Sequence, residues 1–392
     1  MDLKLISILM LSAGLAACGG SGSGSSASDN GSTDSGNGST GLTTLTDTSW
    51  SAGSDRILGI GYSGNATNPV ITTLKGTPVT GQDGDLFSLR SVAYPATELA
   101  EIKSIDNLND LTHFQDLAVM DGYVIACQDG ANTKGYEKAA SLHIFKATDT
   151  SKTEKIDIEV GGDFQTRACA SISAAFTQGT SDAMAAKVFM VGLTYIDLGG
   201  GSYQTRDTLT EIQLTFDTTK DMDAKDAIDV DSIAKIYTAD FSDTLLGVTH
   251  WAHKLYFFQY DDSEGTNNLK YLNTALAPYT AITVDETAND AFASNTAQSM
   301  HVKDMFMIPA TRSTGSDTIY MVSNSGAPGI VTAAYRDDIR TSRRMALSTN
   351  SNTENCSDVI AGVANNGVGA KMWCYDSTEA GKIVEITSPV AQ

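Results

Sequence analysis

The sequence has 392 residues and is strongly acidic, with 47 Asp and Glu against 26 Lys and Arg and a formal net charge of −21. Such a surface repels nucleic acids and anionic lipid head groups, so neither is expected as a partner. The same charge favours solubility and attracts divalent cations.

The first 17 residues have the pattern of an export signal. Lys4 precedes an apolar run from Leu5 to Leu15 that is too short to span a membrane. The run leads into Leu15-Ala16-Ala17-Cys18, which resembles the lipobox of bacterial lipoproteins. The resemblance implies cleavage before Cys18 and lipidation of Cys18. Because Gly19 follows, it also implies anchoring in the outer membrane, facing the periplasm or the cell surface. A plain signal peptide is the alternative.

Residues 18–47 are rich in glycine and serine and contain almost nothing that a core could bury. Chains of this composition are flexible coils. We therefore expect residues 1–17 to be a signal peptide, residues 18–47 a lipidated tether, and residues 48–392 the folded domain.

The folded domain begins with RILGIGYSG, in which Gly59, Gly61 and Gly64 match the G-x-G-x-x-G fingerprint of dinucleotide-binding proteins. That fold requires a helix directly after the glycines. The next residues are NATNPVITTLKGTPVTG, whose prolines, glycines and β-branched residues do not form a helix. The sequence predicts a strand here and no nucleotide site.

Apolar, β-rich runs recur along the chain: LGIGYSG, VIACQDG, FMVGLTY, YFFQYDD, YMVSNSG and MWCYDST. Aligning them by eye spaces the units 51 to 67 residues apart, and strand-like segments precede and follow most of them. This repeat predicts an all-β fold, a single β-propeller of about six four-stranded blades, with seven as the alternative. The segment LTTLTDTSW could close the ring as an N-terminal strand.

Four cysteines follow Cys18, and an even number in an exported protein suggests two disulfides. The segment between Cys356 and Cys374 reads as strand, Asn-Asn-Gly turn and strand, which sets these two cysteines opposite each other. Cys127 then pairs with Cys169.

The sequence contains no catalytic or metal-binding signature. The motif HWAH carries His250 and His253 next to an expected turn, and residues 221–231 carry five aspartates without the glycine and glutamate of an EF-hand. We predict no cofactor and no metal site, with weak calcium binding by the acidic loop as the exception.

Ligands of propellers usually bind where the innermost strands begin. The polar residues at these predicted starts form a candidate binding set: Gln115, Asp116, Arg167, Asp243, His301 and Asp358. A second candidate is the basic cluster of YRDDIRTSRR, which could meet an acidic partner: Arg336, Arg340, Arg343 and Arg344.

Together these features predict a lipid-anchored propeller that binds a protein or glycan partner and performs no chemistry. The alternative is an enzyme that acts on an extracellular polysaccharide or ester through carboxylates at the channel mouth. A third hypothesis is a periplasmic assembly factor.

Overall fold

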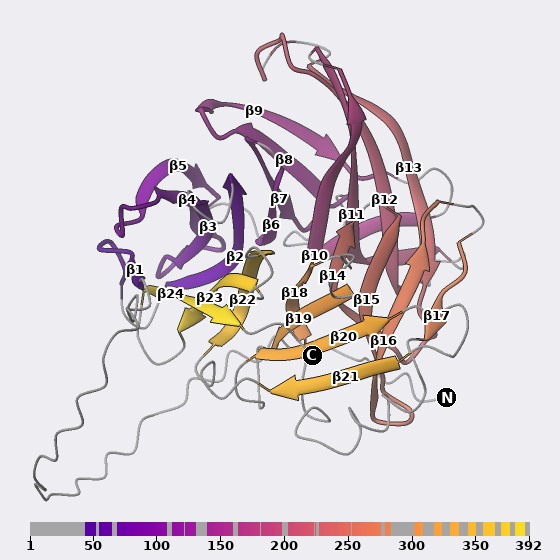
Figure 1. Ribbon diagram of the computed structural model, residues 1–392. Helices are drawn as coiled ribbons and strands as arrows, with labels where there is room; N and C mark the ends of the chain where they lie inside the picture. Colours follow the sequence, from indigo (N-terminus) through magenta and orange to yellow (C-terminus); the bar gives the residue numbers. More distant parts are fainter. Residues whose placement is uncertain are drawn as a thin grey trace, which may run out of the picture. The chain divides into compact units, whose positions relative to one another are not determined.

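Among the residues that the structure describes, the regular elements are all strands (Figure 1). Residues 42–392 form one compact unit, separate from residues 1–41. The computed structural model describes residues 44–392 apart from residues 52–54, 65–68, 108–111, 121, 131–138, 160–163, 181, 198–202, 223, 225–226, 252, 276–278, 284–301, 309–316, 324–329, 337–343, 350–355, 365–369, 377–380 and 389–392. Within these ranges, no helix is long and apolar enough to cross a membrane.

The described strands pair into antiparallel four-stranded sheets, and five of these sheets use four consecutive strands. Sheet 1 contains β2 (Arg56–Gly64), β3 (Pro69–Pro78), β4 (Asp85–Ala93) and β5 (Ala100–Asp106). Sheet 2 contains β6 (Phe114–Met120), β7 (Tyr123–Gln128), β8 (Ser141–Lys146) and β9 (Asp149–Asp157). Sheet 3 contains β10 (Phe164–Gly179), β11 (Ala183–Asp197), β12 (Tyr203–Asp217) and β13 (Ile228–Thr238).

Sheet 4 contains β14 (Thr244–Trp251), β15 (Lys254–Asp261), β16 (Thr266–Asn273) and β17 (Ile282–Thr283). Sheet 5 contains β18 (Val302–Ile308), β19 (Asp317–Ser323), β20 (Ile330–Arg336) and β21 (Arg344–Thr349). Sheet 6 joins β22 (Cys356–Ala364), β23 (Ala370–Asp376) and β24 (Lys382–Ser388) to the N-terminal strand β1 (Thr44–Thr46).

The sheets follow one another in a closed cycle, which is the arrangement of a β-propeller. The first strand of each sheet contacts the first strand of the next, and β22 of sheet 6 returns to β2 of sheet 1. All six of these innermost strands line one central cavity of about 130 Å³. The hydrophobic core lies between neighbouring sheets, as where Leu74 and Phe87 of sheet 1 pack with Val124 of sheet 2.

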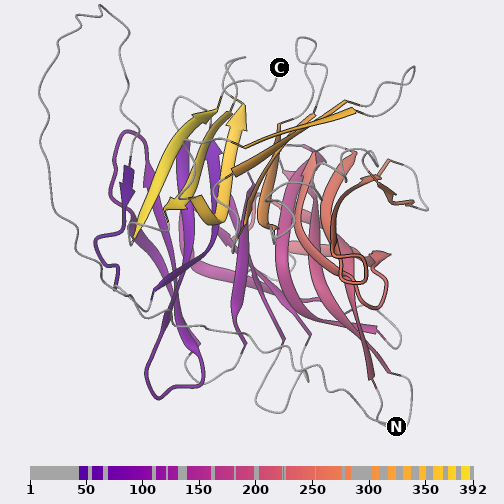
Figure 2. The same ribbon diagram turned by 90° about the horizontal axis from the view of Figure 1, so that it is seen from below.

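The ring is closed by a strand from the N-terminal end of the unit, as LTTLTDTSW suggested. Strand β1 pairs antiparallel with β24, so the indigo and yellow ends of the unit lie side by side (Figure 2). Directly after β1, the buried Asp47 carboxylate lies 3.4 Å from Lys75 Nζ and 3.2 Å from Arg90 Nε. Both cations belong to sheet 1, so this network joins the last sheet to the first. Since β1 is part of the propeller, the folded unit begins before the expected boundary at residue 48.

In the alignment of the six apolar runs, the first run, LGIGYSG, is one strand out of phase with the others. Cys127, Gly192, Gln259, Ser323 and Cys374 all lie on the second strand of their sheets, whereas Gly61 lies on the innermost strand β2. Second strands are buried on both faces, as β7 is at every position, and therefore appear as apolar runs. Strand β2 resembles them because five of its successive residues are also buried.

The glycines of RILGIGYSG are explained by the close approach of β2 to β6. A Cβ on Gly59 would lie 2.6 Å from Leu117 N, and one on Gly61 would lie 2.5 Å from Val119 Cγ2. Gly64 ends the strand with φ of +86°, in the left-handed region that favours glycine. The segment that follows is strand β3 rather than a helix, so the match to a nucleotide fingerprint has no structural counterpart.

Both predicted disulfides are present. Cys127 of β7 is bonded to Cys169 of β10 and joins sheets 2 and 3, and Cys356 is bonded to Cys374 within sheet 6. The expected register of the second pair was wrong, because Cys374 lies opposite Ile360 and Cys356 lies opposite Asp376. The ladder is irregular between Ser357 and Ile360, where Asp358 has φ of +64°. This irregularity brings the two cysteines together from positions that are not directly opposed.

Candidate functional site

The two ends of the innermost strands define two faces. We call the face where these strands begin the N-face and the face where they end the C-face. Gly59 and Gly61 of β2 approach Leu117 and Val119 of β6 in the same order, so these two strands run in the same direction. The predicted binding set belongs to the N-face.

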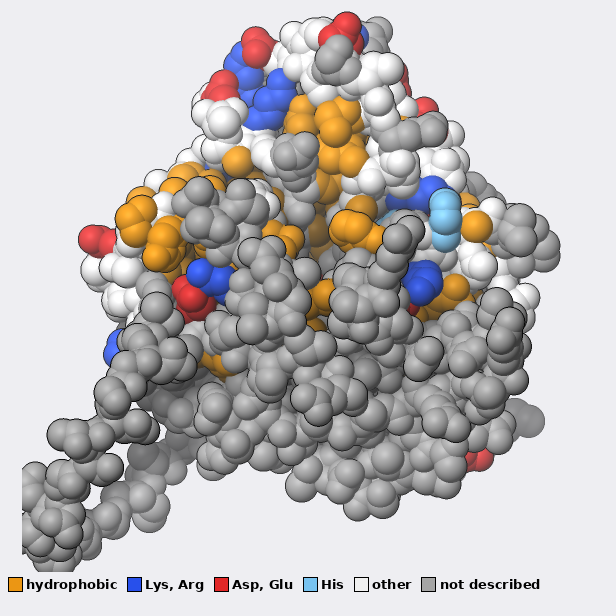
Figure 3. All heavy atoms as spheres, viewed as in Figure 1, with side chains coloured by type: hydrophobic (Ala, Val, Ile, Leu, Met, Phe, Trp, Pro, Cys, Tyr) orange, Lys and Arg blue, Asp and Glu red, His pale blue; other side chains and the backbone are white. Residues whose placement is uncertain are grey.

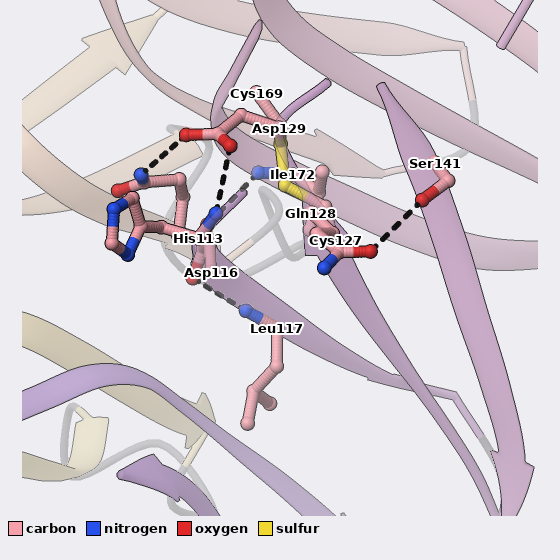
Figure 4. The surroundings of a disulfide bond; sticks show 10 residues. His113, Asp116, Leu117, Cys127, Gln128, Asp129, Ser141, Cys169 and Ile172 are labelled. Atoms are coloured by element: carbon pink, nitrogen blue, oxygen red, sulfur yellow. Dashed lines mark hydrogen bonds between the residues drawn. A yellow bond between two sulfur atoms is a disulfide. The ribbon is translucent and has the colours of Figure 1, made fainter. Parts of the chain in front are cut away.

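Asp116 lies at the interface between sheets 2 and 3 and holds the two sheets together rather than forming an open binding site. Its carboxylate is buried and accepts hydrogen bonds from Leu117 N (2.8 Å) and from Ile172 N of β10 (2.8 Å) (Figure 4). The disulfide Cys127–Cys169 lies beside these bonds in the same view. Buried carboxylates that accept backbone amides hold neighbouring strands in register.

Asp304 repeats this arrangement between sheets 5 and 6. Its carboxylate accepts hydrogen bonds from Met305 N (2.7 Å) and from Ile360 N of β22 (2.9 Å), and the residue lines the central cavity. The cavity is otherwise lined mainly by apolar residues such as Ile60, Val119 and Val248. Its volume of about 130 Å³ accommodates a few water molecules but no sugar ring or larger ligand.

The other members of the predicted set lie on different sheets and are not brought into one cluster by the described contacts. Gln115 donates from Nε2 to Asp129 Oδ2 (3.0 Å), and Asp243 accepts from Gln259 Nε2. Burial, followed by the charge of Asp261, raises the pKa of Asp243. Arg167 lies on β10 and Asp358 on β22, whereas His301 lies outside the described residues.

The basic cluster is described only in part. Arg336 ends β20 and Arg344 begins β21, and the register of this hairpin sets the two residues directly opposite each other. Arg340 and Arg343 lie outside the described residues.

Two partly buried groups have strongly shifted pKa values. Burial raises the pKa of Asp207 on β12 to about 6, against the lowering effect of the hydrogen bond from Leu245 N. Burial, assisted by the charge of Lys155, lowers the pKa of His143 on β8 to about 4. The neutral imidazole of His143 donates from Nε2 to Gln128 Oε1 (2.8 Å). Both groups make hydrogen bonds within the fold, and neither lines one of the two described pockets.

A larger pocket opens at the C-face, between sheets 3 and 4, with a volume of about 500 Å³. It exists because sheet 3 is longer than its neighbours: β10 has 16 residues and β14 has 8. The additional length places residues 175–177 of β10 beside the turn between β14 and β15. The wall and rim of the pocket comprise Ala175, Phe176, Thr177, Lys187, His250, Trp251, His253, Thr274 and Ala275.

The aromatic groups of this pocket are held by the surrounding core. The Phe176 ring packs edge to face against Tyr123 and Phe216, with centroids 5.9 and 5.6 Å away. The His250 ring lies 4.4 Å from the Phe189 ring, and His250 N donates to Ser173 Oγ (3.1 Å). Trp251 remains 54% exposed at the rim. The pocket therefore combines a fixed apolar wall with an accessible indole.

Contacts with the surrounding fold hold polar residues of the pocket in place. Lys187 Nζ lies 3.2 Å from Glu211 Oε1, and this buried carboxylate also accepts from Gln213 Nε2 (2.5 Å) and from Tyr279 OH (3.2 Å). His253 O accepts from Thr274 N (2.8 Å), which fixes the turn against the end of β16. No carboxylate is among the residues that line this pocket.

The residues HWAH provided the sequence signal for this pocket. Trp251 and Lys254 pair across the β14–β15 hairpin, so the turn brings His250 and His253 to one pocket, as the expected turn position implied. No sequence pattern indicates that Phe176 and Lys187 line this pocket, because only the extra length of sheet 3 places them in it. Across the described part of the chain, no group of three or more His, Cys, Asp or Glu side chains is placed to hold a metal ion.

Large exposed apolar side chains are few and separated in sequence. Those described are Tyr94 after β4, Val230 on β13, Phe241 before β14 and Trp251 at the end of β14. Figure 3 shows one face, on which hydrophobic side chains lie between charged ones and a histidine lies near lysine or arginine side chains. Among the four exposed side chains, only Trp251 lines the described pocket.

The comparison with solved structures found the following similar chains. An α-L-arabinanase of Penicillium chrysogenum complexed with arabinobiose matches with a TM-score of 0.50 and 10% identity, over 88% of this chain and 98% of that chain. A Trypanosoma rangeli sialidase matches with a TM-score of 0.45 and 8% identity, over 87% and 56%. A Synechocystis apocarotenoid oxygenase mutant matches with a TM-score of 0.42 and 9% identity, over 76% and 66%.

This chain spans little more than half of the sialidase and about two thirds of the oxygenase. At identities near 10%, the similarity concerns the fold and not the activity. No protein-family model and no curated protein sequence matches this chain. The chain has an all-β, β-propeller fold.

Proposed function

We propose that this protein is a glycan-binding module and that the C-face pocket between sheets 3 and 4 is its binding site. The observation that carries the proposal is the half-exposed indole of Trp251 at the rim of a pocket of about 500 Å³. Sugar rings present an apolar face of C–H groups and a perimeter of hydroxyls. An aromatic ring flanked by hydrogen-bonding groups is complementary to both.

The other lining residues fit this role. Phe176 offers a second apolar wall, while Thr177, Thr274 and the two histidines can bond to sugar hydroxyls. Glycan binding agrees with the geometry better than hydrolysis, because glycoside hydrolysis generally requires a pair of carboxyl groups beside the bond that is cleaved. None of the residues that line this pocket carries a carboxyl group.

A glycan also fits better than a large protein surface. Protein partners generally bury an apolar patch of several hundred Å², and the described exposed apolar side chains come from separate turns and strands. We further propose that Cys18 is lipidated and anchors the module to the outer membrane through the Gly/Ser-rich segment, on the resemblance of Leu15-Ala16-Ala17-Cys18 to a lipobox.

The test is a glycan array probed with the parent protein and with Trp251→Ala. We expect retention on at least one glycan class, reduced at least about tenfold in Trp251→Ala, which corresponds to about 1.4 kcal/mol of binding free energy. Phe241→Ala is the matched control, because Phe241 is 64% exposed but lies at the turn before β14 rather than at the pocket. Equal retention by Trp251→Ala and the parent would show that the pocket is not the site.

A further inference from the structure

The charge of the one lysine at the C-face pocket is compensated by a buried carboxylate. Among the described residues that line the pocket, Lys187 on β11 is the only Lys, Arg, Asp or Glu. Its Nζ lies 3.2 Å from Oε1 of Glu211 on β12, whose side chain is only 3% exposed and does not line the pocket. The positive charge of Lys187 is therefore matched by a negative charge inside the fold.

Three donors hold the Glu211 carboxylate in this position. Besides Lys187, Gln213 Nε2 donates to Oε1 (2.5 Å) and Tyr279 OH donates to Oε2 (3.2 Å). Taking one partner away from a buried ion pair leaves the other charge uncompensated, which is strongly unfavourable. A ligand therefore gains little by drawing the Lys187 ammonium group away from Glu211.

This pairing disfavours both classes of charged ligand. An anionic ligand is repelled by a chain of formal net charge −21, and at the pocket it meets an ammonium group that is already paired. A cationic ligand finds no carboxylate among the lining residues, and burying a charge without a partner is costly. An uncharged ligand incurs neither penalty.

An uncharged sugar can still form hydrogen bonds with the lysine. An ammonium group has three N–H donors, so Lys187 can donate to a sugar hydroxyl while it remains paired with Glu211. Thr177 and Thr274 also line the pocket, and threonine hydroxyls both donate and accept. The pocket thus offers hydrogen bonds to hydroxyl groups without presenting a net charge from its lysine.

We propose that Glu211 is a specificity-determining residue, which neutralises Lys187 and thereby restricts the C-face pocket to uncharged glycans. This inference rests on the proposed function and names the class of ligand for that site. Glu211 acts through Lys187 and does not itself contact the ligand.

The test begins with the glycan array. We expect the retained glycans to be uncharged, and the one retained most strongly is then measured by calorimetry as an oligomer. The same oligomer is compared after its primary hydroxyl groups have been oxidised to carboxylates. We expect the uncharged form to bind at least about tenfold more tightly. Its affinity should change by less than about twofold between about 50 mM and about 500 mM salt, because there is no ionic contact to screen.

Two matched variants test the role of Glu211. Glu211→Gln keeps the shape of the side chain but leaves the charge of Lys187 uncompensated. We expect the oxidised oligomer to bind this variant at least about fivefold more tightly than it binds the parent, and the gain should disappear at high salt. Glu385→Gln should bring no such gain. The Glu385 carboxylate lies 3.0 Å from Lys371 in sheet 6, outside both described pockets, and in each pair the glutamate lies opposite the residue two positions after its lysine.

The outcomes separate this inference from the proposed function. Retention of charged glycans alone, lost in Trp251→Ala, would overturn the uncharged class and leave the glycan site intact. A folded Glu211→Gln protein that binds the oxidised oligomer no better than the parent would overturn the role of Glu211. The array and the salt titration use the parent, so they test the ligand class even if Glu211→Gln does not fold. Failure of every glycan on the array would overturn the proposed function itself.

Discussion

Substituting Gly59 by alanine tests the packing of β2 against β6. A Cβ at this position would lie 2.6 Å from Leu117 N and 2.9 Å from Asp116 Oδ1. Those two atoms form a hydrogen bond of 2.8 Å, which helps to hold the buried carboxylate in place. The new methyl group must therefore displace either the β6 backbone or the carboxylate that joins sheets 2 and 3.

The expected loss follows from these contacts. Overpacking of a tight interior site costs about 1–3 kcal/mol. Disturbing a hydrogen bond to a charged acceptor costs about 1.5–3 kcal/mol more. We therefore expect Gly59→Ala to lower the free energy of unfolding by about 3 kcal/mol or more, measured by urea denaturation of the oxidised protein.

Gly76→Ala is the matched control on the neighbouring strand β3. Its Cβ would lie 3.1 Å from Leu58 Cδ1, the end of a flexible side chain that can move aside. We expect a change within about 1 kcal/mol, because alanine also restricts the unfolded chain. If Gly59→Ala were as stable as Gly76→Ala, the close approach of β2 and β6 would be refuted.

Two further predictions concern the change in the free energy of unfolding with pH, and the two changes have opposite directions. Burial raises the pKa of Asp207 to about 6, so its contribution to stability is present below about pH 4 and is lost as the pH rises through 6. Asp207→Asn should be more stable than the parent by about 3 kcal/mol at pH 7 and equal to it below about pH 4, by urea denaturation across this range. Burial lowers the pKa of His143 to about 4, so the parent should lose about 3 kcal/mol as the pH falls from about 6.5 to 4. His143→Gln should not show this loss in the same titration, and a parallel decline in both proteins would contradict the buried neutral imidazole.

Much of the fold could be predicted from the sequence because the second strands are buried on both faces. Their apolar runs, such as the fully buried β7, made the repeat visible and gave the strand class and the ring. The cysteine pairing followed from a local hairpin and elimination. Burial alone could not show that LGIGYSG is the first strand of its sheet. Strand β2 has five successive buried residues, as second strands do, and it is distinguished by its position beside β6.

The candidate site was less predictable for a physical reason. The usual position of ligand sites in propellers predicts a site at the N-face. There, the Asp116 carboxylate instead accepts hydrogen bonds from backbone amides at the interface between sheets 2 and 3. The C-face pocket arises from a difference in strand length between β10 and β14, which brings together residues far apart in the chain. Periodicity alone gives no indication that Phe176 of one sheet lies beside Trp251 of the next.

The central claim, that Trp251 contacts the ligand, is tested most directly by ¹⁹F NMR of protein labelled with 5-fluorotryptophan. The chain has 3 tryptophans, so the spectrum should contain three resonances, and Trp251→Phe assigns the one from the pocket. Trp373 is 1% exposed and serves as an internal reference. Titration with an oligosaccharide that binds should shift the Trp251 resonance and leave that of Trp373 unchanged. Saturable binding that leaves the Trp251 resonance unmoved would contradict the account.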